Sequence, residues 1–275
     1  MDAKRILFIT QELSPYLETS EIAAISRTLA PGIQERGREI RTFMPRYGSI
    51  NERRNQLHEV IRLSGMNLII DDTDYPLIIK VASLQPARMQ VYFIENDDFS
   101  QKKCPYCNED GSGYDDNDER CVFFVRGVLE TVKKLRWNPD LIHCHGWMTA
   151  LTALYIKKHY SDNPCFAKTK VVYSIYENEY NTPFNQTFAK KVMVPGIEEG
   201  DLNSILTKQD CMALNKLAID HCDGVIQGSK NIEKEMVDYA AMKKKPFLSY
   251  QGDNGYVEAF DDFYNEVMKV EKAVV

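Results

Sequence analysis

The beginning of the chain shows a strand pattern, a helix pattern and a second strand pattern in close succession. Residues 4–10 form a compact apolar run, which is typical of a strand covered on both faces. Apolar residues then recur at helical spacing over residues 20–36, and Gly37 is suited to ending a helix. Residues 40–44 predict the next strand. This order makes a βαβ unit, so we expect a parallel sheet.

The same rhythm returns later in the chain after an interruption. Residues 57–95 resemble three strands separated by turn residues and predict an antiparallel excursion, and residues 97–116 have the composition of a surface loop. From Asn117 onward helices and strands alternate again, up to an amphipathic helix over residues 256–270. We therefore expect an α/β fold with a single doubly wound, mostly parallel Rossmann-like sheet. Ligands of such sheets bind beyond the carboxyl ends of the strands.

Charge and cysteine content exclude several classes of protein. A net charge of −6 argues against a nucleic-acid partner, because phosphate binding depends on clustered basic residues. No apolar stretch approaches the ~20 residues that span a bilayer, and the N-terminus lacks the pattern of a signal peptide. Seven cysteines without a secretory signal indicate reduced thiols, so we expect a cytoplasmic protein that is not bound to a membrane.

Four further motifs follow the opening unit along the chain. They are MPRYG (residues 44–48), YDDNDERCVFFVR (residues 114–126), DLIHCHGWMTAL (residues 140–151) and DGVIQGSKNIEKEM (residues 223–236). In this order, and with the opening unit, they resemble the N-terminal, acceptor-side domain of bacterial ADP-glucose-dependent glycogen/starch synthases, which are glycosyltransferases with the GT-B fold. The resemblance covers most of residues 4–240 and implies a Rossmann-like fold and a place in glucan metabolism.

The residues that would carry the family's chemistry are replaced. In the family, the loop after the first strand reads Lys-Thr-Gly-Gly-Leu and meets the sugar nucleotide, whereas residues 18–22 read ETSEI here. Two carboxylates therefore stand where a diphosphate requires positive charge and close backbone approach. The resemblance also places Gly146, Met148 and Tyr176 where the family has an aspartate and two histidines. We expect no independent synthase activity and assign no catalytic residue.

The resemblance further implies that half of the usual synthase is missing. In the family a second Rossmann-like domain carries most of the nucleotide site, and fewer than 40 residues follow Met236 here. We expect residues 1–275 to form one domain, with a family-like core over residues 4–240. Residues 241–275 would form a tail whose helix packs back on this core, because its apolar stripe needs a surface to cover. A homodimer contact through the same stripe is the alternative.

Several polar and aromatic residues are candidates for a ligand crevice. His143 and His145 lie at the carboxyl end of a predicted strand and share one face if that strand continues to His145. They are either buried, hydrogen-bonded residues or a grip on a glucan. The aromatic residues between 173 and 188 are likewise either a sugar platform or core. The candidate crevice residues are Glu18, Thr19, Asn117, Arg120, His143, His145, Trp147 and Tyr176.

The sequence predicts neither a metal site nor a cofactor. Cys104 and Cys107 form a C-x-x-C pair, but a structural zinc site usually has a second pair, and none is present. The acidic residues 109–119 lack the spacing of a calcium loop. We therefore interpret the two cysteines as free loop thiols.

Three functions remain open on these grounds. The first is a synthase-like protein of glucan metabolism that does not catalyse transfer alone and binds α-glucan or a protein partner. The second is an active subunit that transfers glucose from ADP-glucose to 1,4-α-glucan with a donor domain from another chain. The third is a purely structural or regulatory protein that has kept only the fold. The residues favour the first.

Overall fold

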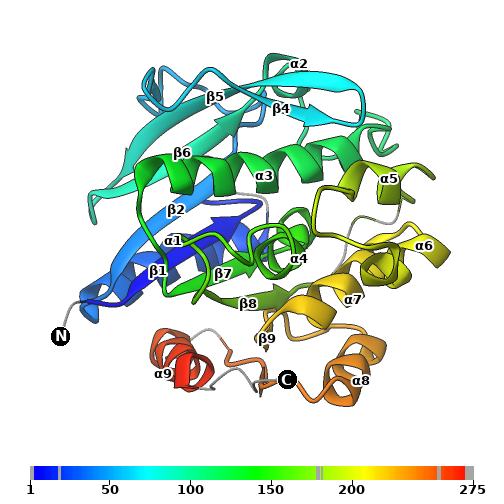
Figure 1. Cartoon of the computed structure of the whole chain (residues 1–275). Helices are drawn as coiled ribbons and strands as arrows, with labels where there is room; N and C mark the ends of the chain where they lie inside the picture. Colours follow the sequence, from blue (N-terminus) through cyan, green and yellow to red (C-terminus); the bar gives the residue numbers. More distant parts are fainter. Residues whose placement is uncertain (1–2, 18–19, 178–179, 181, 253–254, 270–275) are drawn as a thin grey trace.

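The structure, a computed structural model, describes residues 3–17, 20–177, 180, 182–252 and 255–269. The strands of this part of the chain form one sheet with the order β10-β9-β8-β7-β1-β2-β6-β5-β3, and β4 pairs with β5 beside it (Figure 1). The strands are β1 (Arg5–Thr10), β2 (Glu39–Pro45), β3 (His58–Glu59), β4 (Met66–Ile70), β5 (Thr73–Leu84), β6 (Met89–Glu95), β7 (Leu141–His145), β8 (Lys170–Ile175), β9 (Gly224–Gln227) and β10 (Phe247–Leu248).

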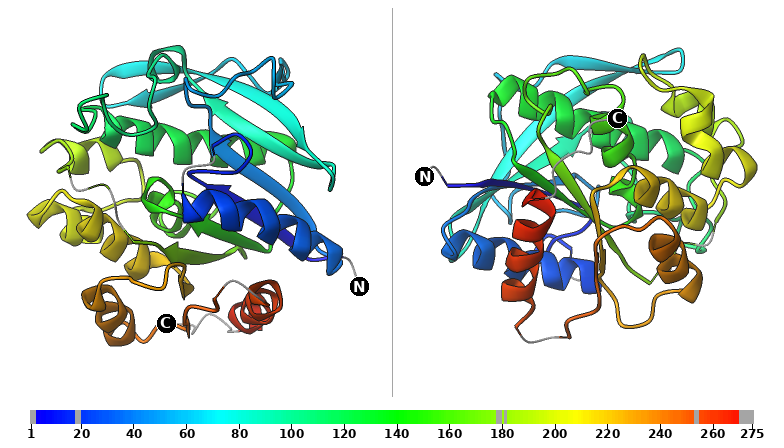
Figure 2. Two further views of the ribbon diagram at one scale, coloured as in Figure 1. Left: turned by 180° about the vertical axis from the view of Figure 1, so that it is seen from behind. Right: turned by 60° about the horizontal axis from the view of Figure 1, so that its bottom comes forward.

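Helices cover both faces of this sheet. From β1 the chain moves to β2 in one direction, whereas β7, β8 and β9 follow one another in the opposite direction. Because crossovers between parallel strands are right-handed, the helices of the two halves lie on opposite faces (Figure 2). None of the described helices is long and apolar enough to cross a membrane. The helices are α1 (Glu21–Glu35), α2 (Asp97–Ser100), α3 (Asn117–Leu135), α4 (Leu151–Lys157), α5 (Phe188–Val192), α6 (Asn203–Thr207), α7 (Cys211–His221), α8 (Lys234–Met242) and α9 (Tyr256–Lys269), with 3₁₀ turns η1 (Trp147–Thr149) and η2 (Glu199–Leu202).

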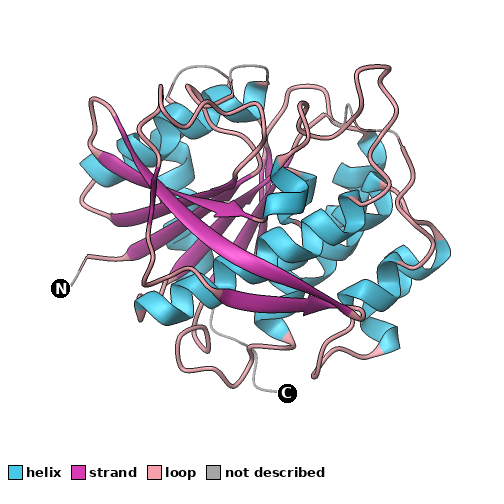
Figure 3. Ribbon diagram, turned by 90° about the horizontal axis from the view of Figure 1, so that it is seen from above, coloured by secondary structure: helices cyan, strands magenta, loops and turns pink. Residues whose placement is uncertain are grey.

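The pairing of the strands confirms the predicted sheet. Strand β1 lies parallel to β2 and β7, and β7, β8 and β9 continue the parallel order. Strand β5 pairs antiparallel with β3, β4 and β6, which confirms the excursion expected within residues 57–95, although it contains four strands and not three because the two-residue strand β3 is too short to show a pattern. Seen from above, the strands lie between the helices and the long strand β5 crosses the near side (Figure 3). The fold is therefore a mostly parallel, doubly wound α/β sheet with an antiparallel extension.

The segment 97–116 differs from the predicted surface loop. It begins with helix α2, in which Phe99 and Ser100 are buried. The Phe99 ring stacks on Tyr75 at 5.0 Å and meets the edge of Phe123 at 5.4 Å. One aromatic side chain in a polar segment buries enough area to hold its neighbours against the sheet, and composition alone does not reveal this.

The C-terminal helix α9 packs against α1 and β8. Its buried side chains, Phe260, Phe263, Tyr264 and Val267, are each at most 4% exposed. Glycines let the backbones approach closely: a Cβ on Gly32 of α1 would lie 2.9 Å from Val257, and one on Gly224 would lie 2.8 Å from Val267. On the rim, the Arg38 guanidinium donates to both carboxylate oxygens of Asp261 at 2.9 and 3.2 Å. Val270 of the predicted apolar stripe lies outside the described residues.

Candidate functional site

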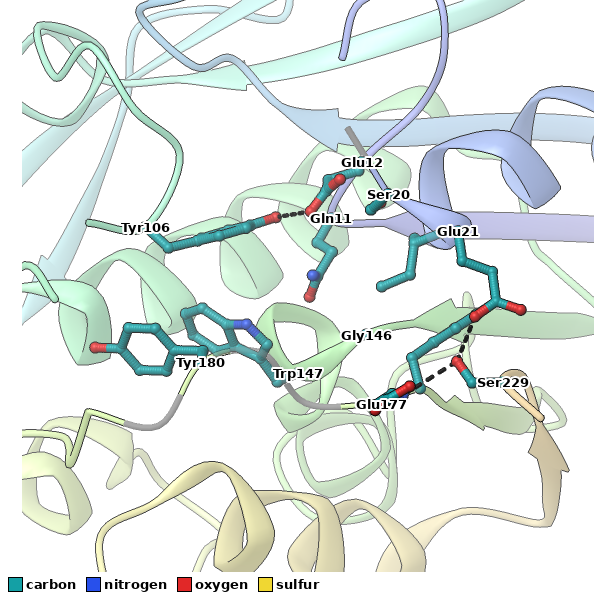
Figure 4. Close-up of a pocket in the computed structure, with 12 residues that line it drawn as sticks. Gln11, Glu12, Ser20, Glu21, Tyr106, Gly146, Trp147, Glu177, Tyr180 and Ser229 are labelled. Carbon is teal, nitrogen blue, oxygen red and sulfur yellow. Dashed lines mark hydrogen bonds between the residues drawn. The ribbon is translucent and has the colours of Figure 1, made fainter. Parts of the chain in front are cut away.

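A cavity of about 140 Å³ lies at the carboxyl edge of the sheet (Figure 4). Its walls come from the ends of β1, β7, β8 and β9 and from the first turn of α1. Strands β7 and β2 pair with β1 on its two opposite edges, so the strand order reverses at β1. Crevices of doubly wound sheets occur at such a reversal. The lining residues are Gln11, Glu12, Ser20, Glu21, Ile22, Tyr106, Gly146, Trp147, Tyr176, Glu177, Tyr180 and Ser229.

The charged groups of this pocket are all carboxylates. Glu12, Glu21 and Glu177 line it, and no lysine, arginine or histidine does so among the described residues. Ser229 Oγ donates to Glu21 Oε2 at 2.6 Å and accepts from the Glu177 backbone N–H at 3.1 Å. Glu21 also lies in the first turn of α1, where the helix dipole stabilises a negative charge. The pocket therefore attracts cations and hydrogen-bond donors and repels anions.

Trp147 forms one wall and is largely covered by other aromatic rings. Tyr180 stacks on the indole with 5.0 Å between ring centroids and 16° between planes (Figure 4). Tyr106 belongs to another wall, and its ring centroid lies 5.4 Å from that of the indole. The ring centroid of Phe184 also lies 5.4 Å from the indole centroid. Only 4% of Trp147 remains exposed. The protein's own rings thus occupy most of the aromatic surface that a sugar would use, and what remains open is the small pocket between them.

Asn117 and Arg120 lie behind these walls and hold them in place. Asn117 Nδ2 donates to the Tyr106 carbonyl at 2.8 Å and to the Tyr180 hydroxyl at 2.9 Å. The Arg120 guanidinium in turn donates to Asn117 Oδ1 at 2.7 Å. Asn117 is 1% exposed and Arg120 is 5% exposed, so both position the two tyrosines from within the fold.

His143 and His145 lie beneath the pocket and have no exposed surface. Strand β7 extends through His145, so both rings lie on one face, with centroids 3.8 Å apart. His143 Nδ1 and Nε2 form 2.7 Å hydrogen bonds with the hydroxyls of Tyr264 and Ser174, and His145 Nδ1 forms one with Tyr176 Oη. Burial lowers the pKa of His143 well below its usual value and that of His145 to about 3. Both histidines are therefore buried and neutral, with both ring nitrogens of His143 hydrogen-bonded and His145 Nε2 without a partner among the described residues.

Comparison with known proteins assigns the chain to a family. Residues 5–249 match the family model described as the starch synthase catalytic domain. The chain belongs to this family. The resemblance to the glycogen/starch synthase family deduced from the sequence motifs is therefore confirmed.

The similar proteins are longer than this chain. Glycogen synthase of Chlorobaculum tepidum is 30% identical over 267 residues, which cover 94% of this chain and 51% of the relative. Glycogen synthase of Chlorobium limicola is 34% identical over 173 residues, which cover 62% of this chain and 35% of the relative. The chain thus spans about half the length, or less, of the curated relatives it matches.

A solved structure shows the same fold. The catalytic domain of starch synthase IV from Arabidopsis thaliana, bound to ADP and acarbose, superposes with a TM-score of 0.70 at 18% identity. The superposition covers 90% of this chain and 51% of that one. At this identity the likeness shows that the two chains share a fold over the superposed region, and it carries no residue roles.

Two positions that differ from the starch synthase pattern are filled by neighbouring side chains. Gly146, where the resemblance places an aspartate, has φ of 83° and ψ of 168°, and a Cβ there would collide with the side-chain amide of Gln11. Tyr176 stands where the resemblance places a histidine. Its ring packs directly on Gly228, and a Cβ on Gly228 would lie 2.6 Å from ring atoms of Tyr176. A neighbouring residue therefore fits each replacement. The Gln11 amide occupies the space beside Gly146, and the ring of Tyr176 fits because Gly228 has no side chain.

Replacing Gly146 by alanine should destabilise the fold by about 2–3 kcal/mol. The combination of φ and ψ at this position is essentially restricted to glycine and costs other residues roughly 1–3 kcal/mol, and the Gln11 contact adds to that cost. Urea denaturation measures the change. Adding Gln11→Ala to the Gly146→Ala variant should recover only the part of the lost stability that comes from the contact with Gln11. Gly200→Ala is the matched control, because a Cβ on Gly200 meets nothing within 4 Å. Equal effects at Gly146 and Gly200 would contradict the assignment.

The other candidate residues lie in different places. Glu18 and Thr19 lie outside the described residues, although Ser20, Glu21 and Ile22 directly after them line the pocket. Cys104 and Cys107 are unpaired and half-buried in the loop that carries Tyr106. Across the described ranges, no group of three or more His, Cys, Asp or Glu side chains could hold a metal ion.

Sequence reasoning did not single out several residues of the pocket. Gln11 and Glu12 directly follow the first strand, so the rule that ligands bind beyond strand ends would have found them. Tyr106 carries no such signal, because its neighbours in sequence are polar and its partners are distant. Its hydroxyl donates to Glu12 Oε1 at 2.8 Å across 94 residues of sequence.

Proposed function

We propose that this chain is an acceptor-side domain of the starch synthase type that binds α-glucan and does not transfer glucose on its own. The observation that carries the proposal is the pocket itself, which has three carboxylates and no cationic side chain among its described lining residues. It lies at the edge of the sheet where ligands of this architecture bind.

The charge of the pocket suits a neutral sugar better than a sugar nucleotide. Glucosyl transfer from ADP-glucose requires cations or dipoles that stabilise the departing diphosphate. Carboxylates such as Glu21 and Glu177 repel a diphosphate, whereas sugar hydroxyls can donate hydrogen bonds to them. The exposed parts of Tyr106 and Tyr180 supply aromatic surface for a sugar ring. The starch synthase IV domain is bound to ADP and acarbose; of the two ligand classes, we extend only the sugar to this chain.

The test uses the purified chain with separate assays of binding and of turnover. Calorimetry should show binding of maltoheptaose and no binding of ADP. Incubation with labelled ADP-glucose or UDP-glucose and glycogen should show no transfer, since the loss of even one charge-stabilising group typically lowers the rate ~10²-fold. Glu177→Gln should weaken maltoheptaose, while Glu59→Gln on strand β3, outside the pocket, should not.

Two results would overturn the proposal. One is binding of ADP without any response to maltoheptaose. The other is glucose transfer by the chain that a single substitution in the pocket abolishes, because such turnover would make the chain a complete catalyst.

A further inference from the structure

The carboxylate of Glu12 is the least satisfied polar group of the pocket. Glu12 follows strand β1 and is 4% exposed. Its Oε1 accepts the hydrogen bond from Tyr106, but its Oε2 is buried without a partner among the described residues. A buried carboxylate oxygen is normally paired, because burial removes its water without returning a hydrogen bond. Figure 4 shows this carboxylate at the upper wall, held by Tyr106.

The surroundings of Glu12 offer it no cation from the described chain. The Arg120 guanidinium donates to Asn117 and lies over the rings of Tyr114 and Tyr47, and Arg120 is not part of the pocket lining. Glu21 and Glu177 add two more carboxylates. The remaining walls include the rings of Tyr106, Trp147, Tyr176 and Tyr180. Carboxylates together with aromatic faces form an environment that favours an organic cation.

We propose that this pocket binds a protonated primary amine and that the Glu12 carboxylate is the countercharge that recognises it. A primary ammonium group has three donors, one for the Glu12 carboxylate and two for other oxygens of the lining. A cavity of about 140 Å³ has room for such a group and the carbons next to it. The ligand chemistry that fits both the charge and the crevice is an amino sugar. This inference goes beyond glucan binding and does not depend on it.

Other ligand classes fit the pocket less well. An anion would face three carboxylates without a countercharge. A metal ion requires several ligands within one coordination sphere, and the described His, Cys, Asp and Glu side chains form no such group of three. A neutral sugar could bind beside Glu12 but would supply no charge to pair with it. A protonated amine supplies both a donor and the charge.

The experiment compares amines with matched neutral sugars on the intact chain at pH 7 and low salt. Calorimetry should give glucosamine at least tenfold tighter binding than glucose. N-acetylglucosamine should bind no better than glucose, because acetylation removes the charge. Spermidine is the second amine probe: if it binds tightly and competes with glucosamine, the amine site stands and its ligand is a polyamine. Glucosamine binding no tighter than that of glucose would overturn the proposal.

Substitutions of the pocket glutamates test whether the Glu12 carboxylate is responsible for the preference for glucosamine. Glu12→Gln keeps an acceptor for Tyr106 and removes the charge, so glucosamine affinity should fall at least tenfold while the melting temperature stays the same or rises. Glu21→Gln, at an exposed position, should weaken glucosamine severalfold and provides an independent reading if Glu12→Gln misfolds. Glu59→Gln is the control. Unchanged affinity in both pocket variants would refute the inference. Maltoheptaose binding, measured in parallel, reports separately on the proposed function.

Discussion

Removal of residues 256–275 is expected to destabilise the protein by roughly 6 kcal/mol or more. The deletion takes away four side chains of α9 that are at most 4% exposed, and burial of each such side chain contributes about 1.5–3 kcal/mol. The deletion also exposes the surfaces around Gly32 and Gly224 on which α9 packs. It removes the Tyr264 hydroxyl, which is hydrogen-bonded to His143 Nδ1. The melting temperature should fall by more than about 10 °C, which differential scanning calorimetry measures.

A point variant provides the control for this deletion. Tyr264→Phe keeps the buried ring and removes only the hydrogen bond with His143, so it should cost about 1 kcal/mol. A truncated chain that stays soluble and melts at the original temperature would show that α9 does not stabilise the domain. A large effect that depended on protein concentration would instead indicate a contact between two copies.

Acidification should produce the second large effect. The pKa of His145 is lowered to about 3 in the folded protein by burial, whereas an unfolded histidine titrates near 6.5. Below pH 6.5 the unfolded chain therefore binds a proton that the folded chain does not, and stability is lost as the pH falls. At pH 5 this loss is about 2 kcal/mol for His145 alone. The pKa of His143 is lowered for the same reason, so its contribution has the same sign.

Urea denaturation at pH 7, 6 and 5 measures this dependence. His145→Gln removes the titrating group, so the fall in unfolding free energy between pH 7 and 5 should become smaller by up to the amount assigned to His145. His58→Gln serves as the control, because His58 is exposed on strand β3. An unchanged pH dependence in a chain that lacks both His143 and His145 would show that other groups govern the acid sensitivity.

The sheet could be predicted because its signals are local. The apolar run before Gln11 and the helical repeat that follows indicate strand β1 and helix α1 without any knowledge of their partners. The helices Cys211–His221 and Tyr256–Lys269 likewise carry their own periodicity. The order of the strands within the sheet, in contrast, was not predicted. Helices α5 and α6 were not predicted, since five residues are too few to show a period.

The interior of the pocket could not be predicted in the same way, because it depends on contacts between distant segments. Tyr106 is held by hydrogen bonds with Glu12 and Asn117, and the three residues belong to three different parts of the chain. The resemblance showed that Gly146 lacks the family's side chain, but it did not show that the Gln11 amide takes up that room. Periodicity and motif order contain no information on how neighbouring replacements fit together.

The fit between Gly146 and Gln11, and between Tyr176 and Gly228, restricts the routes by which this protein can evolve. An aspartate at position 146 would meet the side chain of Gln11, and any larger residue at position 228 would meet the ring of Tyr176. Substitutions at these positions are therefore coupled to their neighbours. We expect a change at position 146 or 228 to be tolerated best when Gln11 or Tyr176 changes with it.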